Sequence, residues 1–140
     1  MRLETKRQRT LDAVSLGMSP PDIDTAQLFL QALGVALSTG DFAPVAALLT
    51  SDVECVTPQR SGYGLEAVTE ELSRARPPET LALEFERGDW KTLGNGRYAC
   101  EVRALFRSKS TGEVSYSRDR SFVLTVSAGK ISRCEMRFAE

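Results

Sequence analysis

The second half of the chain consists of long segments in which apolar and polar residues alternate, and this pattern restricts the possible folds more than any other feature. An alternation with a period of two places one set of side chains on each face of a strand, which is typical of an antiparallel sheet with one buried face. Turn residues at 94–96, 110–112 and 128–129 separate the segments. The pattern therefore predicts strands at about 80–92, 96–109, 113–127 and 130–138.

Three helices are expected before these strands. The first follows Asp24, a suitable capping residue, and ends at Gly40 in a position that favours a left-handed residue. A second, short helix follows Asp41, and a third runs from about 65 to 75. Each carries an apolar stripe that needs a partner surface. The stripe of the first helix consists of Ala26, Phe29, Leu30, Leu33, Ala36 and Leu37.

Residues 52–58 complete the expected elements as a strand that ends at Pro58. Helices first, followed by long consecutive strands, are the order of an α+β domain. Strands of this length twist and curl, so we expect the helices to pack on the concave side of a strongly curved, mostly antiparallel sheet. A cavity between the helices and the sheet follows from that arrangement.

Residues 1–21 are expected to form an N-terminal arm that is separate from this domain. Charged and apolar residues interleave along the arm, and Pro20–Pro21 ends it. The arm is interpreted either as a short helix or as an unordered terminus. Residues 22–140 then form one domain, and a chain of this size is long enough to bury a real core.

The chain of 140 residues contains no histidine. This absence removes the Ser-His and Cys-His nucleophile pairs and the histidine-rich metal sites. Three cysteines without short spacing argue against a zinc knuckle and a disulfide framework, and a net charge of -1 does not predict a basic face for nucleic acid. No apolar segment is long enough to span a bilayer. We therefore expect a cytoplasmic protein with no metal, no other cofactor, and no nucleic-acid or membrane partner.

Five short phrases follow one another in a familiar order, at residues 36–42, 48–54, 64–68, 129–131 and 136–138. Together they resemble the nuclear transport factor two-like superfamily, in particular its SnoaL-like and ketosteroid-isomerase-like members. The resemblance covers roughly residues 22–139. It implies a cone-shaped α+β barrel whose pocket is closed by the first helix. Because this fold hosts many functions, the resemblance predicts architecture more strongly than activity.

Ketosteroid isomerases use an Asp base together with an oxyanion hole of Tyr and a protonated Asp. The resemblance places the base at Thr57, the tyrosine at about Leu33, and the acid near Ser121 or Phe122. Thr57 does not ionise in the useful range, and Leu33 has no hydrogen-bond donor on its side chain. We therefore expect negligible ketosteroid isomerase activity.

The expected cavity is largely apolar. Val53, Cys55 and Thr57 share one face of the first strand, and the first helix places Phe29 and Leu33 across the opening. Such a cavity suits a hydrophobic or aromatic small molecule. The predicted ligand-binding residues, which include one on the loop before the third helix, are Phe29, Leu33, Cys55, Thr57, Tyr63, Val102, Cys134 and Phe138.

Asp119 is the candidate catalytic residue, because it lies near the position at which the resembling family keeps an acid. If it faces the cavity, it is placed to act as a general base or as an oxyanion donor. If Phe122 and Leu124 are buried, Asp119 points outward into a surface ion pair, and Arg120 points inward at the rim. Cys55 also has two interpretations, a nucleophile or an inert buried thiol.

Two functions from different classes remain open. One is a protein that binds a small hydrophobic molecule, and the other is an isomerase, cyclase or dehydratase that uses Asp119 as an unconventional acid or base. A homodimer is also expected, formed by the outer sheet face that includes Arg133, Glu135 and Arg137. An Asp, Glu or Tyr side chain that points into the cavity would favour the enzyme.

Overall fold

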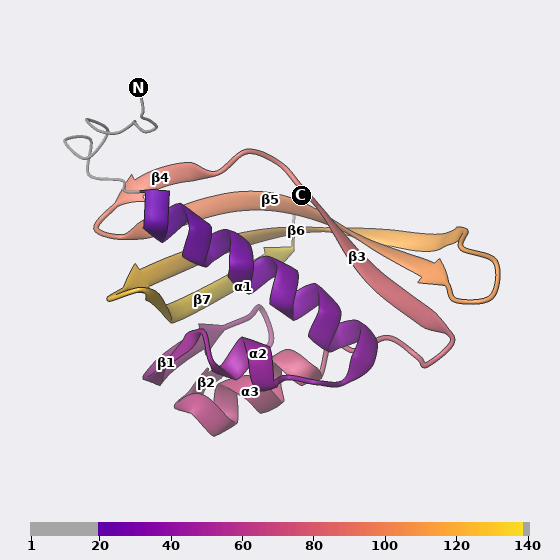
Figure 1. The fold of residues 1–140 in the computed structure, drawn as a ribbon, viewed down its shortest axis with the longest axis horizontal. Helices are drawn as coiled ribbons and strands as arrows, with labels where there is room; N and C mark the ends of the chain where they lie inside the picture. Colours follow the sequence, from indigo (N-terminus) through magenta and orange to yellow (C-terminus); the bar gives the residue numbers. More distant parts are fainter. Residues whose placement is uncertain (1–19, 139–140) are drawn as a thin grey trace.

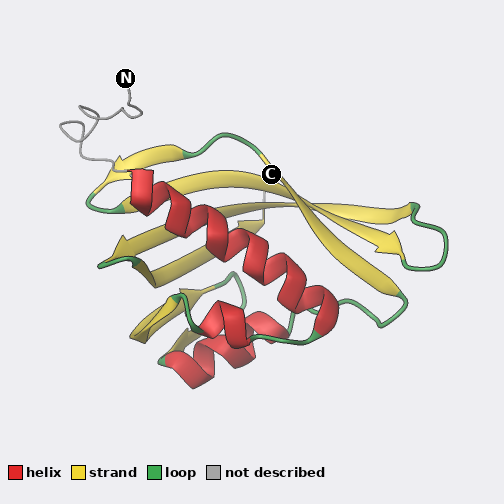
Figure 2. Ribbon diagram, in the orientation of Figure 1, coloured by secondary structure: helices red, strands yellow, loops and turns green. Residues whose placement is uncertain are grey.

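The computed structural model describes residues 20–138, and it confirms an α+β fold in which three helices pack on a curved sheet (Figure 1). The helices are α1 (Pro20–Thr39), α2 (Ala43–Ala46) and α3 (Leu65–Ser73). The strands are β1 (Leu49–Val56), β2 (Ser61–Tyr63), β3 (Leu81–Arg87), β4 (Lys91–Gly94), β5 (Arg97–Ser108), β6 (Val114–Ser127) and β7 (Lys130–Phe138). The longest helix, α1, crosses the sheet diagonally (Figure 2).

The seven strands form one sheet in the order β2-β1-β7-β6-β5-β3, and β4 also pairs with β5. Only the β1–β7 pair of this described sheet is parallel, so the prediction of a mostly antiparallel sheet is confirmed. The register shifts once between β5 and β6 and once between β6 and β7. Such irregularities bend strands and increase their twist. The sheet is therefore curved but not closed, with β2 and β3 at its edges.

Helix α1 covers the concave face with the predicted apolar stripe. Phe29 is fully buried and Leu33 is 2% exposed. Near the end of the helix, the Ser38 hydroxyl donates to the Leu83 carbonyl at 3.0 Å and accepts from the Leu83 amide at 2.9 Å. This contact satisfies backbone groups on the edge strand β3 that would otherwise face solvent. Gly40 then ends the helix with φ of +89°, as predicted.

The buried faces of β5 and β6 form the other half of the core. Phe122 is 1% exposed and packs edge-to-face against Phe85, with ring centroids 6.0 Å apart. Burial of a side chain of this size contributes roughly 2–3 kcal/mol. The buried residues of the two strands follow the predicted alternation, and they include Tyr98, Cys100, Val102, Ala104, Phe122, Leu124 and Val126.

The predicted start of the first helix is wrong, because α1 already includes Pro20, four residues before Asp24. Proline lacks a backbone N–H, and the first turn of a helix does not need one, so Pro20 and Pro21 fit there without breaking the helix. The rest of the expected arm, residues 1–19, lies outside the described residues. The described helices include none long and apolar enough to cross a membrane.

The expected strand at 80–92 is in fact two strands, β3 and β4. Between them, the Gly88 amide still donates to the Glu101 carbonyl at 2.8 Å. The chain then turns so that the Trp90 indole N–H donates to the Gln27 side chain on α1 at 3.3 Å. A further difference is the short strand β2 around Gly62, which is not among the strands expected from the sequence.

Candidate functional site

A cavity of about 260 Å³ lies between α1, α3 and the concave face of the sheet. Residues of α1, of α3 and of the sheet form its walls, and the helices do not fill all of the space on the concave face of the sheet. Four phenylalanines from four different strands contribute to the walls, and most of the other lining groups are aliphatic. The lining residues are Leu33, Leu37, Thr57, Gln59, Glu71, Leu72, Arg74, Ala75, Leu83, Phe85, Ala104, Phe106, Arg120, Phe122, Met136 and Phe138.

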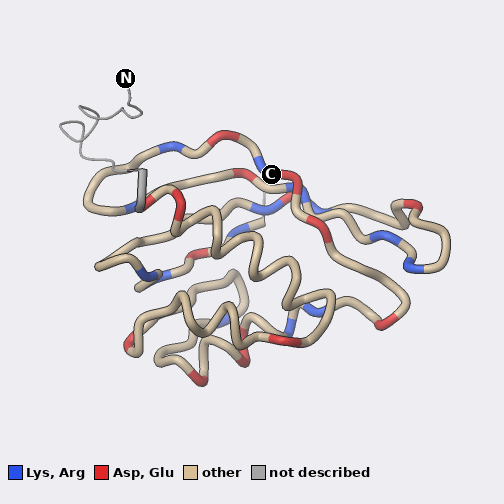
Figure 3. The backbone as a smooth tube through the Cα atoms, viewed as in Figure 1, with Lys and Arg blue, Asp and Glu red and all other residues tan. Residues whose placement is uncertain are grey.

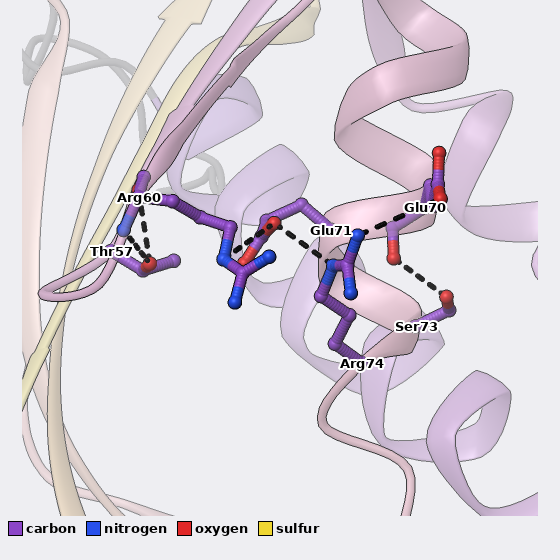
Figure 4. A network of polar contacts seen from close by, with 6 residues as sticks. All are labelled: Thr57, Arg60, Glu70, Glu71, Ser73 and Arg74. Atoms are coloured by element: carbon purple, nitrogen blue, oxygen red, sulfur yellow. Dashed lines mark hydrogen bonds and ion pairs between the residues drawn. The ribbon is translucent and has the colours of Figure 1, made fainter.

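Glu71 is the acid among these lining residues, and its side chain is only 12% exposed. Helix α3 buries Val68 and Leu72, which places Glu71 at the edge of the buried face. The Glu71 Oε1 atom lies 3.3 Å from Arg74 Nε and 3.7 Å from Arg60 Nε. Figure 4 shows the carboxylate held between these two guanidinium groups. The sequence analysis assigned no role to Glu71. Its spacing of three residues from Val68 nevertheless indicates that it lies close to the buried face of the helix.

Thr57 lines the cavity, but its hydroxyl is committed to the turn between β1 and β2 (Figure 4). The Thr57 hydroxyl donates to the Arg60 carbonyl at 3.0 Å and accepts from the Arg60 amide at 3.2 Å. The Thr57 amide also donates to the same carbonyl at 2.9 Å. The residue therefore fixes the position of Arg60 and supplies no acid or base to the cavity.

Arg120 lies on the sheet side of the cavity. This is the position expected for it if Phe122 and Leu124 are buried. Its guanidinium carbon is 4.5 Å from the centroid of the Phe138 ring, a cation–π arrangement. Its Nη1 atom donates to the backbone carbonyl of Asp119 at 2.9 Å. Partial burial and, next, the nearby Arg118 lower the pKa of Arg120. Within residues 20–138, no carboxylate lies within 4.0 Å of this guanidinium.

The predicted ligand-binding residues separate into two groups in the structure. Leu33, Thr57 and Phe138 line the cavity. The remaining residues do not, because the buried ones pack into the core below it and Tyr63 is 70% exposed on β2. The core group consists of Phe29, Cys55, Val102 and Cys134.

Asp119 lies outside the cavity lining and points away from the buried set of β6. Its Oδ1 atom accepts a hydrogen bond of 2.9 Å from Arg103 Nε on the neighbouring strand β5. Both side chains are about half exposed. This geometry matches the alternative in which Asp119 forms a surface ion pair, a type of contact that contributes little stability.

The three cysteines are buried and have no disulfide bonds. Cys55 on β1 and Cys134 on β7 are paired in register and share a hydrogen bond between their thiols. That bond, followed by burial, raises the pKa of Cys134, while the same bond lowers the pKa of Cys55. Burial also raises the pKa of Cys100. The described part of the chain contains no group of three or more side chains arranged to hold a metal ion.

A second, more open groove of about 400 Å³ runs along the outer side of α1 beside β3. Leu30, Val35 and Phe85 are among its lining residues, and Val35 is 59% exposed. After Asp24, α1 carries no charged residue, as Figure 3 shows. The charged residues that line the groove, Glu84 and Arg87, therefore come from β3 and not from the helix.

No protein-family model and no curated protein sequence matches the chain. Solved structures do match. An NTF2-like protein from Anabaena variabilis has a TM-score of 0.70 and 15% identity, covering 88% of this chain and 93% of that one. TerC, co-crystallised with polyporic acid, has a TM-score of 0.62 and 18% identity, covering 85% and 92%. A proposed polyketide cyclase from Xanthomonas campestris has a TM-score of 0.57 and 19% identity, covering 84% and 93%.

Proposed function

Since the chain has the NTF2-like fold, we propose that it binds a hydrophobic or aromatic small molecule in the cavity between α1, α3 and the sheet. The observation that carries the proposal is the lining itself, to which four phenylalanine rings contribute. Cavities with mostly apolar walls and a few polar groups are the usual sites for small ligands. The co-crystallisation of TerC, a protein of the same fold, with polyporic acid supports this choice.

Ligand burial provides the driving force for binding in this site. Each 100 Å² of apolar ligand surface removed from water contributes about 2.5 kcal/mol. Phe85, Phe106 and Phe122 present rings from three adjacent strands, so a flat ligand would contact several of them at once. Aromatic pairs in offset or edge-to-face geometry add about 0.5–1.5 kcal/mol beyond burial.

An isomerase, cyclase or dehydratase is the second candidate, and the observation that favours it is the carboxylate of Glu71 in the cavity lining. A general base must reach the proton that it abstracts, however, and the Glu71 carboxylate is shared between Arg60 and Arg74. Leu33 and Thr57 offer no free donor for an oxyanion. An enone isomerisation assay distinguishes the two candidates, since turnover by the wild type that Glu71→Gln abolishes would favour the enzyme.

The binding proposal is tested with N-phenyl-1-naphthylamine, a neutral aromatic probe whose fluorescence rises in apolar surroundings. Ala75 is exposed and lines the cavity, so Ala75→Trp places an indole at its mouth. Val35 is exposed and lines the open groove instead, so Val35→Trp is the matched control. We expect Ala75→Trp to weaken probe binding at least about tenfold, which is the loss of one well-buried contact of roughly 1.4 kcal/mol, and Val35→Trp to leave it unchanged.

The opposite pattern would place the ligand in the groove between α1 and β3 and would contradict the proposal. Equal binding by both variants would mean that neither region holds the probe. A thermal melt of each variant verifies that an altered affinity does not come from an altered fold.

A further inference from the structure

We propose that the cavity selects anions, so that its ligand is an apolar molecule with a carboxylate, sulfonate or phenolate group that pairs with Arg120. This inference rests on the proposed function and adds the chemical class of the ligand. It begins with the balance of charge among the charged residues that line the cavity, which are Glu71, Arg74 and Arg120.

Among residues 20–138, no carboxylate forms an ion pair with Arg120. Glu71 is already paired with Arg74 at 3.3 Å and with Arg60 at 3.7 Å, so it has no spare charge for a third guanidinium. Asp119, the neighbour of Arg120 in sequence, is paired with Arg103 at 2.9 Å on the outer side of the sheet. In the described part of the chain, the cavity therefore has an excess of positive charge at the Arg120 side.

The hydrogen-bonding capacity of Arg120 is largely unused. A guanidinium has five N–H donors, and the described residues accept one of them, at the Asp119 carbonyl. The group lies over the face of the Phe138 ring, and stacking of this kind leaves the in-plane donors available at the edge. A carboxylate or sulfonate is the acceptor that matches two such donors.

The surroundings of Arg120 strengthen an interaction with an anion. Phe122, Phe138 and Met136 line the same part of the cavity and lower the local dielectric constant. Partial burial removes water from the guanidinium, and this loss of solvation lowers the pKa of Arg120. Arginine nevertheless stays charged at neutral pH, so an anionic ligand would restore the lost solvation.

The experiment compares two probes with a common aromatic skeleton in full-length protein. One is the neutral N-phenyl-1-naphthylamine, and the other is 1-anilinonaphthalene-8-sulfonate, which adds one sulfonate. The test variant is Arg120→Met. The control is Arg118→Met, which removes the same charge two residues away on the same strand, where the guanidinium lies 4.8 Å from the Tyr116 ring and does not line the cavity.

We expect Arg120→Met to weaken binding of the sulfonate probe about tenfold, typical of one lost charge-assisted contact. The neutral probe should change less than about twofold, and Arg118→Met should weaken binding of the sulfonate probe much less than Arg120→Met does. Arg120→Lys keeps the charge but loses the planar fork, so its affinity for the sulfonate should lie between wild type and Arg120→Met. The wild-type affinity for the sulfonate should also fall with added salt, and Arg120→Met should remove that dependence.

Equal effects of the two methionine variants on the sulfonate probe would overturn the selection of anions while leaving the proposed function intact. An unchanged sulfonate affinity in Arg120→Met would overturn it too. If neither probe binds the wild type, the proposed function is wrong and this inference is wrong with it.

Discussion

Replacing Gly96 with alanine should destabilise the protein more than the same replacement of Gly94, two residues earlier in the β4–β5 turn. Both glycines have a positive φ, +75° and +85°. At Gly96 an added Cβ would lie 2.7 Å from the Val126 carbonyl oxygen, whereas at Gly94 it would meet nothing within 4 Å. The Gly96 carbonyl also accepts a 2.8 Å hydrogen bond from the Val126 amide, which extends the β5–β6 ladder by one position.

The left-handed conformation alone costs an alanine about 1 kcal/mol. We expect that loss of unfolding free energy for Gly94→Ala. Gly96→Ala adds the displacement of a backbone carbonyl, and forced close packing costs roughly 1–3 kcal/mol, so a total of about 3 kcal/mol is expected. Denaturant unfolding measures both values, provided that the slope m is the same in wild type and variants. Equal losses in the two variants would show that the close approach of Gly96 to Val126 is absent.

Two further predictions concern pH and assembly. Burial, and then the charge of Asp22 and its hydrogen bond, raise the pKa of Tyr98 above its ordinary value. A phenol with a raised pKa in the folded state stabilises the protein below pH about 10 and loses this effect as the pH rises further, so the melting temperature should fall more steeply above pH 10 in wild type than in Tyr98→Phe. The homodimer stays a prediction, and sedimentation velocity should show a dimer that Arg133→Glu dissociates, because this change reverses a charge on the expected interface and leaves it beside Glu54. A steep fall in Tyr98→Phe, or a wild-type monomer at high concentration, would contradict these expectations.

Local patterns predicted much of the fold because they depend on side-chain periodicity. The helical spacing of Phe29 and Leu33 and the alternation around Phe122 each bury one face, and the structure has both faces as predicted. The errors fall where an element begins or breaks. Pro20 is compatible with either a helix start or a helix end, and Gly88 continues the pairing of an edge strand while the chain changes direction.

The cavity was harder to predict, because its composition depends on how far each buried face extends. Cys55 and Thr57 share a face of the first strand in sequence, but in the structure Cys55 is covered by the core while Thr57 lies beyond the end of β1 at the cavity. Glu71 is one of several acids on α3, and only the packing of that helix beside the β1–β2 turn brings Arg60 to it. The position of Arg120 two residues before Phe122 predicted that it lies at the rim. The pattern could not predict that residues 20–138 offer it no ion-pair partner.

The parallel pairing of β1 with β7 also determines the order in which the protein can fold. From β3 to β7 each strand pairs with one close to it in sequence, so that part of the sheet can form from local hairpins. Strand β1 pairs instead with the last strand, with Cys55 opposite Cys134, and this contact closes a loop of most of the domain. Closing so long a loop is entropically unfavourable and slow. We therefore expect the turn that carries Thr57 and Arg60 to reach its place late, and ligand-binding competence to appear only when β1 has paired with β7.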